Sequence, residues 1–233
     1  MSVLGRRAAA EFTGTAFLVM AVVGSGVMAS RLSPGDAGLQ LLQNSLATGA
    51  ALVALIVALQ PVSASFNPVV TLVERALRMI DTTTAGALIA AQVLGGLAGT
   101  VAANLMFGLD AVTFSTHQRS GPALWLAEVI ATVGLLVVIF GTVRSGRADR
   151  VAFAVGGYIT AAYWFTSSTS FANPAVTIAR TVTDTFAGIA PLSAPAFILA
   201  QLLGGAAGYL LVQFLYPTLA TPAVVPADRK VLS

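Results

Sequence analysis

Two asparagine-proline pairs, about a hundred residues apart, carry the clearest chemistry in this sequence. They lie in SFNPVVTL at Ser65–Leu72 and in FANPAVTI at Phe171–Ile178. Asparagine caps the free N–H groups at a helix start, and proline suits the first helical position. One such pair indicates only a helix start. Two copies in matching halves of an apolar chain predict two short helices whose cap residues, Asn67 and Asn173, present side-chain donors within a membrane.

Other kinds of chemistry have little support. The sequence has no cysteine and a single histidine, His117, which lies in a polar connection. A nucleophile with its base, or a set of metal ligands, needs more than this. We therefore expect neither an enzyme nor a metal or cofactor site. The net charge of +3 does not indicate nucleic-acid binding, because the basic residues are scattered through loops and tails.

The composition indicates a protein that crosses a membrane several times. Of its 233 residues, 57% are hydrophobic and 9% are charged, and the mean hydropathy is +0.87. In soluble domains about a quarter of the residues are charged. A bilayer crossing takes about 20 apolar residues. Six stretches are long enough, namely Ala8–Ala29, Leu39–Leu59, Thr84–Leu109, Ala123–Val143, Val151–Phe171 and Pro195–Tyr216.

Two shorter apolar segments, Asn67–Leu77 and Asn173–Val182, begin at the asparagine-proline pairs and are too short to cross. Irregular backbone at membrane depth is tolerated only where protein or a cavity surrounds it. We therefore predict two re-entrant half-helices that enter from opposite sides. Their N-termini, which carry partial positive charge and unpaired N–H groups, then meet at the midplane. There they form a paired donor site that opposes cations and protons.

The two halves of the chain repeat one another. The matching segments are AEFTGT at Ala10–Thr15 with AEVIAT at Ala127–Thr132, and AQVLGGLAG at Ala91–Gly99 with AQLLGGAAG at Ala200–Gly208. Each half has a span with a glutamate, a second span, a half-helix and a span with Gln-Gly-Gly. An odd number of spans per half inverts the second copy. We predict a single channel domain over residues 1–233, with inverted repeats at about 8–109 and 123–216.

The placement of arginine and lysine predicts the orientation. If the N-terminus is cytoplasmic, nine basic residues fall on the cytoplasmic side: Arg6, Arg7, Arg75, Arg78, Arg144, Arg147, Arg150, Arg229 and Lys230. Three fall outside, namely Arg31, Arg119 and Arg180. A cytoplasmic excess of this kind is usual. We therefore expect a multi-pass protein of the cell (inner or plasma) membrane, with both termini cytoplasmic and residues 217–233 forming a cytoplasmic tail.

The sequence resembles the major intrinsic protein family, the aquaporins and aquaglyceroporins. The resemblance extends from Glu11 to Tyr216 and rests on NPVVT, NPAVT, the paired glutamates and the repeated AQ-L-GG. It implies an all-α membrane protein with an hourglass fold of six transmembrane helices and two half-helices. It also implies a lipid-embedded homotetramer, with one pore per subunit for passive flow of small neutral solutes.

Three departures from the family pattern concern the pore. Val69 stands where members usually have alanine. Ser63 and Ser65 stand where the common form has glycine and histidine. Val176 stands where the family usually carries the arginine of its selectivity filter. The nearest arginine, Arg180, lies one helical turn further on, and we expect it to be out of reach of the constriction.

By the spacing usual in the family, the filter positions are Ala47, Ala161, Ser170 and Val176, and Thr48 replaces Ala47 if the span is slipped by one residue. Such a filter is small-sided and uncharged. It predicts a pore for solutes larger than water: glycerol, urea and neutral metalloid hydroxides. The resemblance to bacterial members that lack the arginine, a branch associated with metalloid passage, favours arsenous acid within this class.

Glu11 and Glu128 are intramembrane carboxylates with two open interpretations. They could relay protons, or each could accept hydrogen bonds from the N–H groups of a re-entrant loop, with Gln92 and Gln201 supporting the same loops. The family resemblance supports the second interpretation.

Two alternative functions remain at this stage. The first is a water-selective aquaporin, which Val176 and Ala161 disfavour. The second, more remote, is a proton-coupled secondary transporter. It would need charged substrate-binding residues beside the half-helices, and the sequence shows none that we assign there.

Overall fold

The computed structural model describes residues 2–217, and every regular element in that range is helical. The helices are α1 Val3–Leu32, α2 Ala37–Leu59, α3 Pro68–Ala76, α4 Thr82–Met106, α5 Pro122–Arg144, α6 Val151–Phe165, α7 Pro174–Ala179 and α8 Ala194–Leu215. Two 3₁₀ turns, η1 Ala148–Arg150 and η2 Arg180–Val182, precede α6 and follow α7. The all-α membrane fold expected from the sequence is confirmed. The predicted tail beyond residue 217 lies outside the described residues.

Five of the helices, α1, α2, α4, α5 and α8, are long and apolar enough to cross a membrane, with 22 to 30 residues each. The remaining predicted span, Val151–Phe171, is shorter than expected because α6 ends at Phe165. The backbone becomes extended at Thr166, whose hydroxyl donates to the carbonyl of Ala162 at 2.6 Å. Serine and threonine side chains compete for backbone hydrogen bonds in this way, so the TSSTS run that follows ends the helix.

The long helices pair in the same manner in both repeats. Helix α1 packs along α4, and α5 packs along α8. Small residues make the first contact close: a Cβ at Gly95 or Gly99 of α4 would collide with the backbone carbonyls of Phe12 and Ala16 in α1. In α8, Gly204 and Gly208 face α5: an added Cβ would lie 2.7 Å from the carbonyl oxygen of Val129 and 2.8 Å from the side chain of Leu136, respectively. Close approach through small residues is how transmembrane helices associate, because burial from water contributes little there.

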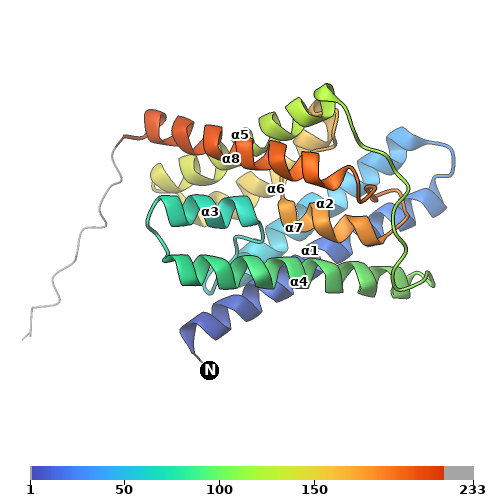
Figure 1. Ribbon diagram of the computed structural model, residues 1–233, viewed down its shortest axis with the longest axis horizontal. Coiled ribbons are helices and arrows are strands. Elements are labelled where there is room, and N and C mark those ends of the chain that lie inside the picture. Colours follow the sequence, from blue (N-terminus) through green and yellow to red (C-terminus); the bar gives the residue numbers. More distant parts are fainter. Residues whose placement is uncertain (1, 218–233) are drawn as a thin grey trace, which may run out of the picture.

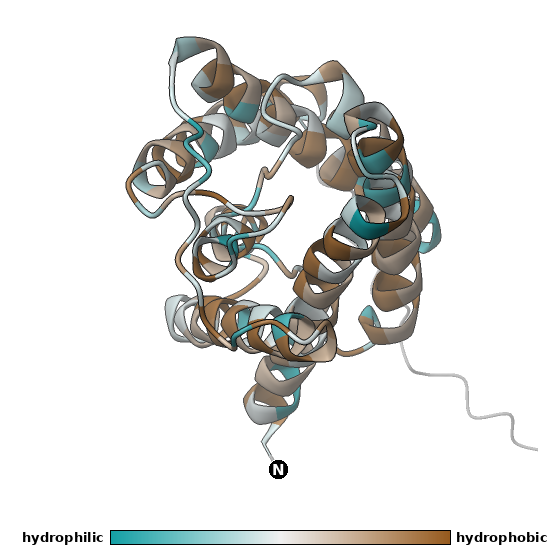
Figure 2. Ribbon diagram, turned by 90° about the vertical axis from the view of Figure 1, so that its right-hand side faces the viewer, coloured by the Kyte–Doolittle hydropathy of each residue, from teal (hydrophilic) through white to brown (hydrophobic). Residues whose placement is uncertain are grey.

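The two half-helices lie inside this bundle and point to opposite ends of it (Figure 1). Seen end-on, the long helices surround them (Figure 2). Large apolar side chains such as Phe153, Leu210 and Phe214 remain exposed on the outside of the bundle. That surface suits contact with lipid.

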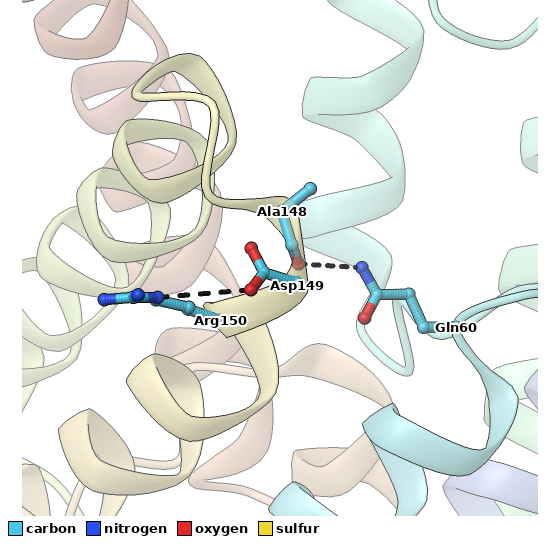
Figure 3. Close-up of polar contacts among 4 residues, drawn as sticks. All are labelled: Gln60, Ala148, Asp149 and Arg150. Atoms are coloured by element: carbon cyan, nitrogen blue, oxygen red, sulfur yellow. Dashed lines mark hydrogen bonds and ion pairs between the residues drawn. The ribbon is translucent and has the colours of Figure 1, made fainter.

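The start of α1 and the end of α8 lie at the same end of the bundle, which we call the terminal end (Figure 1). The α5–α6 turn also lies there. Gln60, after α2, donates from its side-chain amide to the carbonyl of Ala148 at 3.1 Å, so two loops of the terminal end are joined (Figure 3). The adjacent ion pair between Asp149 and Arg150, 4.0 Å long, is exposed and adds little. The opposite end, with the loop of residues 108–121, we call the far end.

Candidate functional site

The loop before α3 is held by one fully buried carboxylate, Glu11 of α1. Its Oε1 accepts hydrogen bonds from the hydroxyl of Ser63 at 2.6 Å and the backbone N–H of Ser65 at 2.8 Å. Its Oε2 accepts from the N–H of Phe66 at 2.7 Å and the amide of Gln92 at 2.8 Å. Each oxygen thus has two donors. A buried charge is tolerated when it is hydrogen-bonded this fully.

Glu128 of α5 does the same for the loop before α7. Its Oε1 accepts from the N–H of Phe171 at 2.9 Å, and its Oε2 accepts from the N–H of Ala172 at 2.8 Å and the amide of Gln201 at 2.7 Å. The side-chain amide of Gln201 also donates to the hydroxyl of Thr177 in α7 at 2.8 Å. In the first repeat, Gln92 donates to Thr71 of α3 in the same way.

These carboxylates hold the backbone in an uncommon conformation just before each half-helix. Phe66 has φ 48° and Ala172 has φ 46°, in the left-handed region that non-glycine residues rarely adopt. Such strain persists only where the surroundings fix it and is typical of functional sites. Here the N–H of each residue is bound by its glutamate. Its carbonyl therefore points toward the other half-helix.

Asn67 and Asn173 use those carbonyls to join the two half-helices. The amide of Asn67 donates to the carbonyl of Ala172 at 2.7 Å, and the amide of Asn173 donates to the carbonyl of Phe66 at 2.8 Å. The side-chain oxygens cap the helices, accepting from the N–H groups of Val69 at 2.9 Å and Ala175 at 3.0 Å. An asparagine NH₂ group has two donors. One N–H of each amide is therefore left for a molecule beside it.

A cavity of about 310 Å³ runs beside both asparagines and along α2 and α6. The α2 and α6 residues in its wall recur every four positions, as one face of a helix requires: Thr48, Leu52 and Ile56, and Val151, Val155, Ile159 and Tyr163. The half-helices add Val70 and Val176. The wall is thus mostly apolar, with few polar groups at fixed positions.

Of the four predicted filter residues, the structure brings two to the cavity. Ser170 and Val176 line it, and the Ser170 hydroxyl is buried with no hydrogen-bond partner among the described residues. Ala47 is half-buried and Ala161 is exposed on the outside of α6, and neither lines the cavity. Thr48, the alternative for α2, does line it.

Tyr163 occupies the cavity wall on α6, two residues beyond the predicted Ala161. Its hydroxyl lies 3.2 Å from that of Thr48. The spacing usual in the family points instead to Ala161, which is exposed on the outside of α6. A four-residue count from Val151 along α6 would have found Tyr163.

Two charged residues, Glu74 of α3 and Arg180 of the η2 turn after α7, also reach the cavity. Arg180, expected to be out of reach, lines the cavity and is 3% exposed, with its guanidinium carbon 3.4 Å from the ring centroid of Phe171. Its Nε donates to the carbonyl of Ala187. Glu74 lines the cavity near the terminal end. Aligning the two asparagine-proline motifs would have marked both, since each stands seven residues after its asparagine.

Two capped half-helices that meet inside a ring of apolar helices, beside a cavity with asparagine donors, define a membrane channel built as an inverted repeat. The chain belongs to the major intrinsic protein family: the sequence pattern of that family matches residues 2–150 and 144–231. This is a family of channels rather than of enzymes.

Sequence identity to individual members of the family supports this assignment. The chain is 49% identical to aquaglyceroporin AqpS of Rhizobium meliloti (strain 1021) over 213 residues, which cover 91% of each protein. It is 32% identical to the lens fiber major intrinsic protein of Rattus norvegicus over 170 residues, which cover 67% of this chain and 61% of that protein.

The fold is also that of a solved structure, the X-ray structure of the aquaglyceroporin from Plasmodium falciparum. The TM-score is 0.71 at 19% identity, over 92% of this chain and 98% of the other. At this identity the likeness concerns the fold alone.

Proposed function

We propose that this chain forms a passive channel for small uncharged solutes, glycerol first among them. The observation that carries the proposal is the cavity beside Asn67 and Asn173, whose wall is mostly apolar with a few donors at fixed positions. A short carbon chain with hydroxyl groups matches such a wall, because its carbons face the apolar side while its oxygens accept hydrogen bonds. The similarity to a protein named an aquaglyceroporin supports the same solute class.

The filter we propose consists of Thr48, Tyr163, Ser170 and Val176, all of which line the cavity. This set replaces Ala47 and Ala161 of the sequence-based prediction. Val176 leaves the first turn of α7 without a charge, and the unpartnered hydroxyl of Ser170 can serve a solute oxygen or hydroxyl. Urea and neutral metalloid hydroxides such as arsenous acid share glycerol's size and lack of charge, and we include them in the proposal.

The hydrogen bonds of the glutamates favour a channel over a proton-coupled transporter. Every oxygen of Glu11 and Glu128 accepts at least one hydrogen bond from a loop N–H or a side chain. A carboxylate that must take up and release a proton in each transport cycle would break these loops each time. Their role is therefore support of the pore loops.

For the membrane context we propose a homotetramer in the cell membrane, with the terminal end in the cytoplasm. Of the ten arginines in residues 2–217, seven belong to segments at the terminal end, and Arg31, Arg119 and Arg180 belong to the far end. The chain has no cysteine, so thiol labelling of an Asp149→Cys variant reports on one position only. We expect the variant to be labelled from the cytoplasmic side. Labelling from outside alone would show that the orientation is the opposite of the one proposed.

The function is tested by solute uptake into proteoliposomes, with glycerol, urea, arsenous acid and water measured in one preparation. We expect glycerol uptake well above that of empty liposomes. Val176→Arg adds five fixed donors and a permanent charge to the constriction, so glycerol and arsenous acid uptake should fall strongly while water flux falls less. Val176→Thr keeps the side-chain size and is the matched control, with glycerol uptake retained.

Two outcomes would contradict this proposal. Water flux without glycerol uptake in the wild type would favour a water-selective channel. Unchanged glycerol uptake in correctly folded Val176→Arg would mean that Val176 does not line the constriction.

A further inference from the structure

The two half-helices carry opposite charges at equivalent positions. Seven residues after its cap asparagine, α3 has Glu74, and seven residues after the other asparagine the turn beyond α7 has Arg180. Both line the cavity. Because the half-helices point to opposite ends of the bundle (Figure 1), Glu74 belongs to the part of α3 nearer the terminal end, and Arg180 follows the end of α7 that faces the far end.

Each charged side chain is held by the same position of its own loop. Ser65 donates from its hydroxyl to Oε1 of Glu74 at 2.9 Å. Phe171, the equivalent of Ser65 in the second repeat, lies under the guanidinium of Arg180. Both charges are therefore fixed beside the pore by the loops that Glu11 and Glu128 hold.

Neither charge is neutralised by an ion pair within residues 2–217, where the one pair found joins Asp149 and Arg150. Oε2 of Glu74 is buried without a hydrogen-bond donor in that range. A half-buried charge without a partner is costly, so its presence in a pore wall points to an action on what passes. Arg119 adds to the positive charge at the far end, with its guanidinium carbon 5.2 Å from the ring centroid of Phe171.

The rest of the pore favours anions. The N-termini of both half-helices present partial positive charge at the middle of the bundle, and Arg180 extends that potential toward the far end. Arg7 also lines the cavity at the terminal end. Among the described residues, Glu74 is the one cavity-lining residue with a negative charge. These positive groups reject cations, but they would draw small anions into a pore whose constriction has Val176 rather than a bulky side chain.

We propose that Glu74 is the specificity-determining residue that excludes anions from this pore, in opposition to Arg180. The inference rests on the proposed function as a channel for neutral solutes. An anion that approaches the terminal end of the cavity meets the carboxylate held by Ser65 and is repelled, whereas a neutral polyol carries no charge on which that carboxylate could act. Ion rejection is thus divided between the two repeats: Arg180 and the half-helix N-termini exclude cations, and Glu74 excludes anions.

The experiment compares glycerol uptake with chloride and nitrate leakage in proteoliposomes at mildly alkaline pH, where the carboxylate is ionised. Glu74→Gln keeps the shape and the acceptor for Ser65 but removes the charge. We expect its anion leakage to rise on the order of tenfold, the size expected for loss of one nearby charge in a partly shielded site. Glycerol uptake should change little. Glu74→Asp should keep the anion barrier.

Two controls make the result specific. Asp149→Asn removes an exposed carboxylate from the same end, outside the cavity wall, and should leave the leakage at the wild-type level. In the double variant Glu74→Gln/Arg180→Gln the leakage should be lower than in Glu74→Gln alone, because one of the positive charges that draw anions is gone.

The outcomes separate this inference from the proposed function. If Glu74→Gln takes up glycerol normally and its anion leakage stays at the wild-type level, Glu74 is not the anion barrier, whereas the channel function stands. If the leakage rises equally in Asp149→Asn, the effect belongs to the surface charge of that end and the assignment to Glu74 fails. If the wild type takes up no glycerol, it is the proposed function that fails.

Discussion

The two repeats of this channel use the same scaffold, but they place charges of opposite sign in the pore wall. In each, a buried glutamate holds two backbone N–H groups, a glutamine bridges that glutamate to a threonine of the half-helix, and an asparagine caps the half-helix. The residues that face the cavity are matched only in part: Asn67 corresponds to Asn173 and Val70 to Val176, whereas Glu74 corresponds to Arg180. The groups that hold the pore loops are thus matched between the repeats, whereas the charged groups beside the pore are of opposite sign.

Because Glu11 and Glu128 hold the pore loops in both repeats, we expect their substitution to have the largest effect on folding. Glu11→Leu removes the acceptor of four donors, and Glu128→Leu removes the acceptor of three. Each buried donor left without a partner costs about 1–3 kcal/mol. Both variants should lose most of their folded yield, with Glu11→Leu the more affected.

The measurement for the glutamates is the monodisperse fraction in size-exclusion chromatography in detergent, followed by glycerol uptake of what remains. Glu11→Gln and Glu128→Gln keep one acceptor oxygen and should be milder. A leucine variant that folds normally and loses only a pH-dependent flux would contradict the scaffold role and revive a proton-coupled mechanism.

The scaffold was the part that the sequence predicted well, because each of its residues occurs twice. Asn67 and Asn173, the two glutamates and the glutamine-glycine segments stand at matching positions of the repeats. A residue pattern that occurs at matching positions in both halves is a stronger structural signal than a pattern that occurs once. Capping rules then gave the half-helix starts, which the structure places at Pro68 and Pro174.

The pore wall was predicted less well, for a physical reason. Helices surrounded by lipid on one side and protein on the other are apolar all round, so their sequence does not mark which face lines a pore. One residue turns a helix by about 100°. An error of one position therefore separates Ala47 from Thr48, and an error of two separates Ala161 from Tyr163. The sequence also gave no sign that the η2 turn places Arg180 against the ring of Phe171.

Substitutions at the close helix contacts also test how alike the two repeats are, and their expected effect on stability is smaller. At Gly95 of α4 an added Cβ would collide with the backbone carbonyl of Phe12, which cannot move away independently. At the equivalent Gly204 of α8 it would lie 2.7 Å from the carbonyl oxygen of Val129. Overpacking of this kind costs about 1–3 kcal/mol, and the closer contact should make Gly95→Ala the more destabilised variant.

The temperature of thermal aggregation in detergent measures this difference. Gly86→Ala is the matched control, because its Cβ meets nothing within 4 Å and alanine in a helix is favoured over glycine by about 0.5–1 kcal/mol. It should aggregate at the same or a slightly higher temperature. Equal losses at Gly95 and Gly204 would show that the two helix pairs are equally tight.

The smallest effect on folding, with a large effect on flux, is expected where the two repeats touch. Asn67→Ala and Asn173→Ala each remove a helix cap, at about 0.5–2 kcal/mol, and each breaks one of the two crossed bonds to Ala172 and Phe66. Either variant loosens the junction that the other asparagine also holds. The double variant should therefore lose less than the sum of the single losses, as coupled neighbours do.

Serine at each position separates capping from donation, since Asn67→Ser and Asn173→Ser keep a capping oxygen but cannot offer the amide. The serine variants should recover thermal stability relative to alanine, yet show reduced glycerol uptake at equal protein density. Because the two crossed bonds are alike, 2.7 and 2.8 Å long, the reduction should be similar at both positions. Normal uptake in either serine variant would show that its amide is a brace between the repeats and not a donor to the solute. A loss confined to one position would show that the solute is bound by one half-helix rather than by their shared junction.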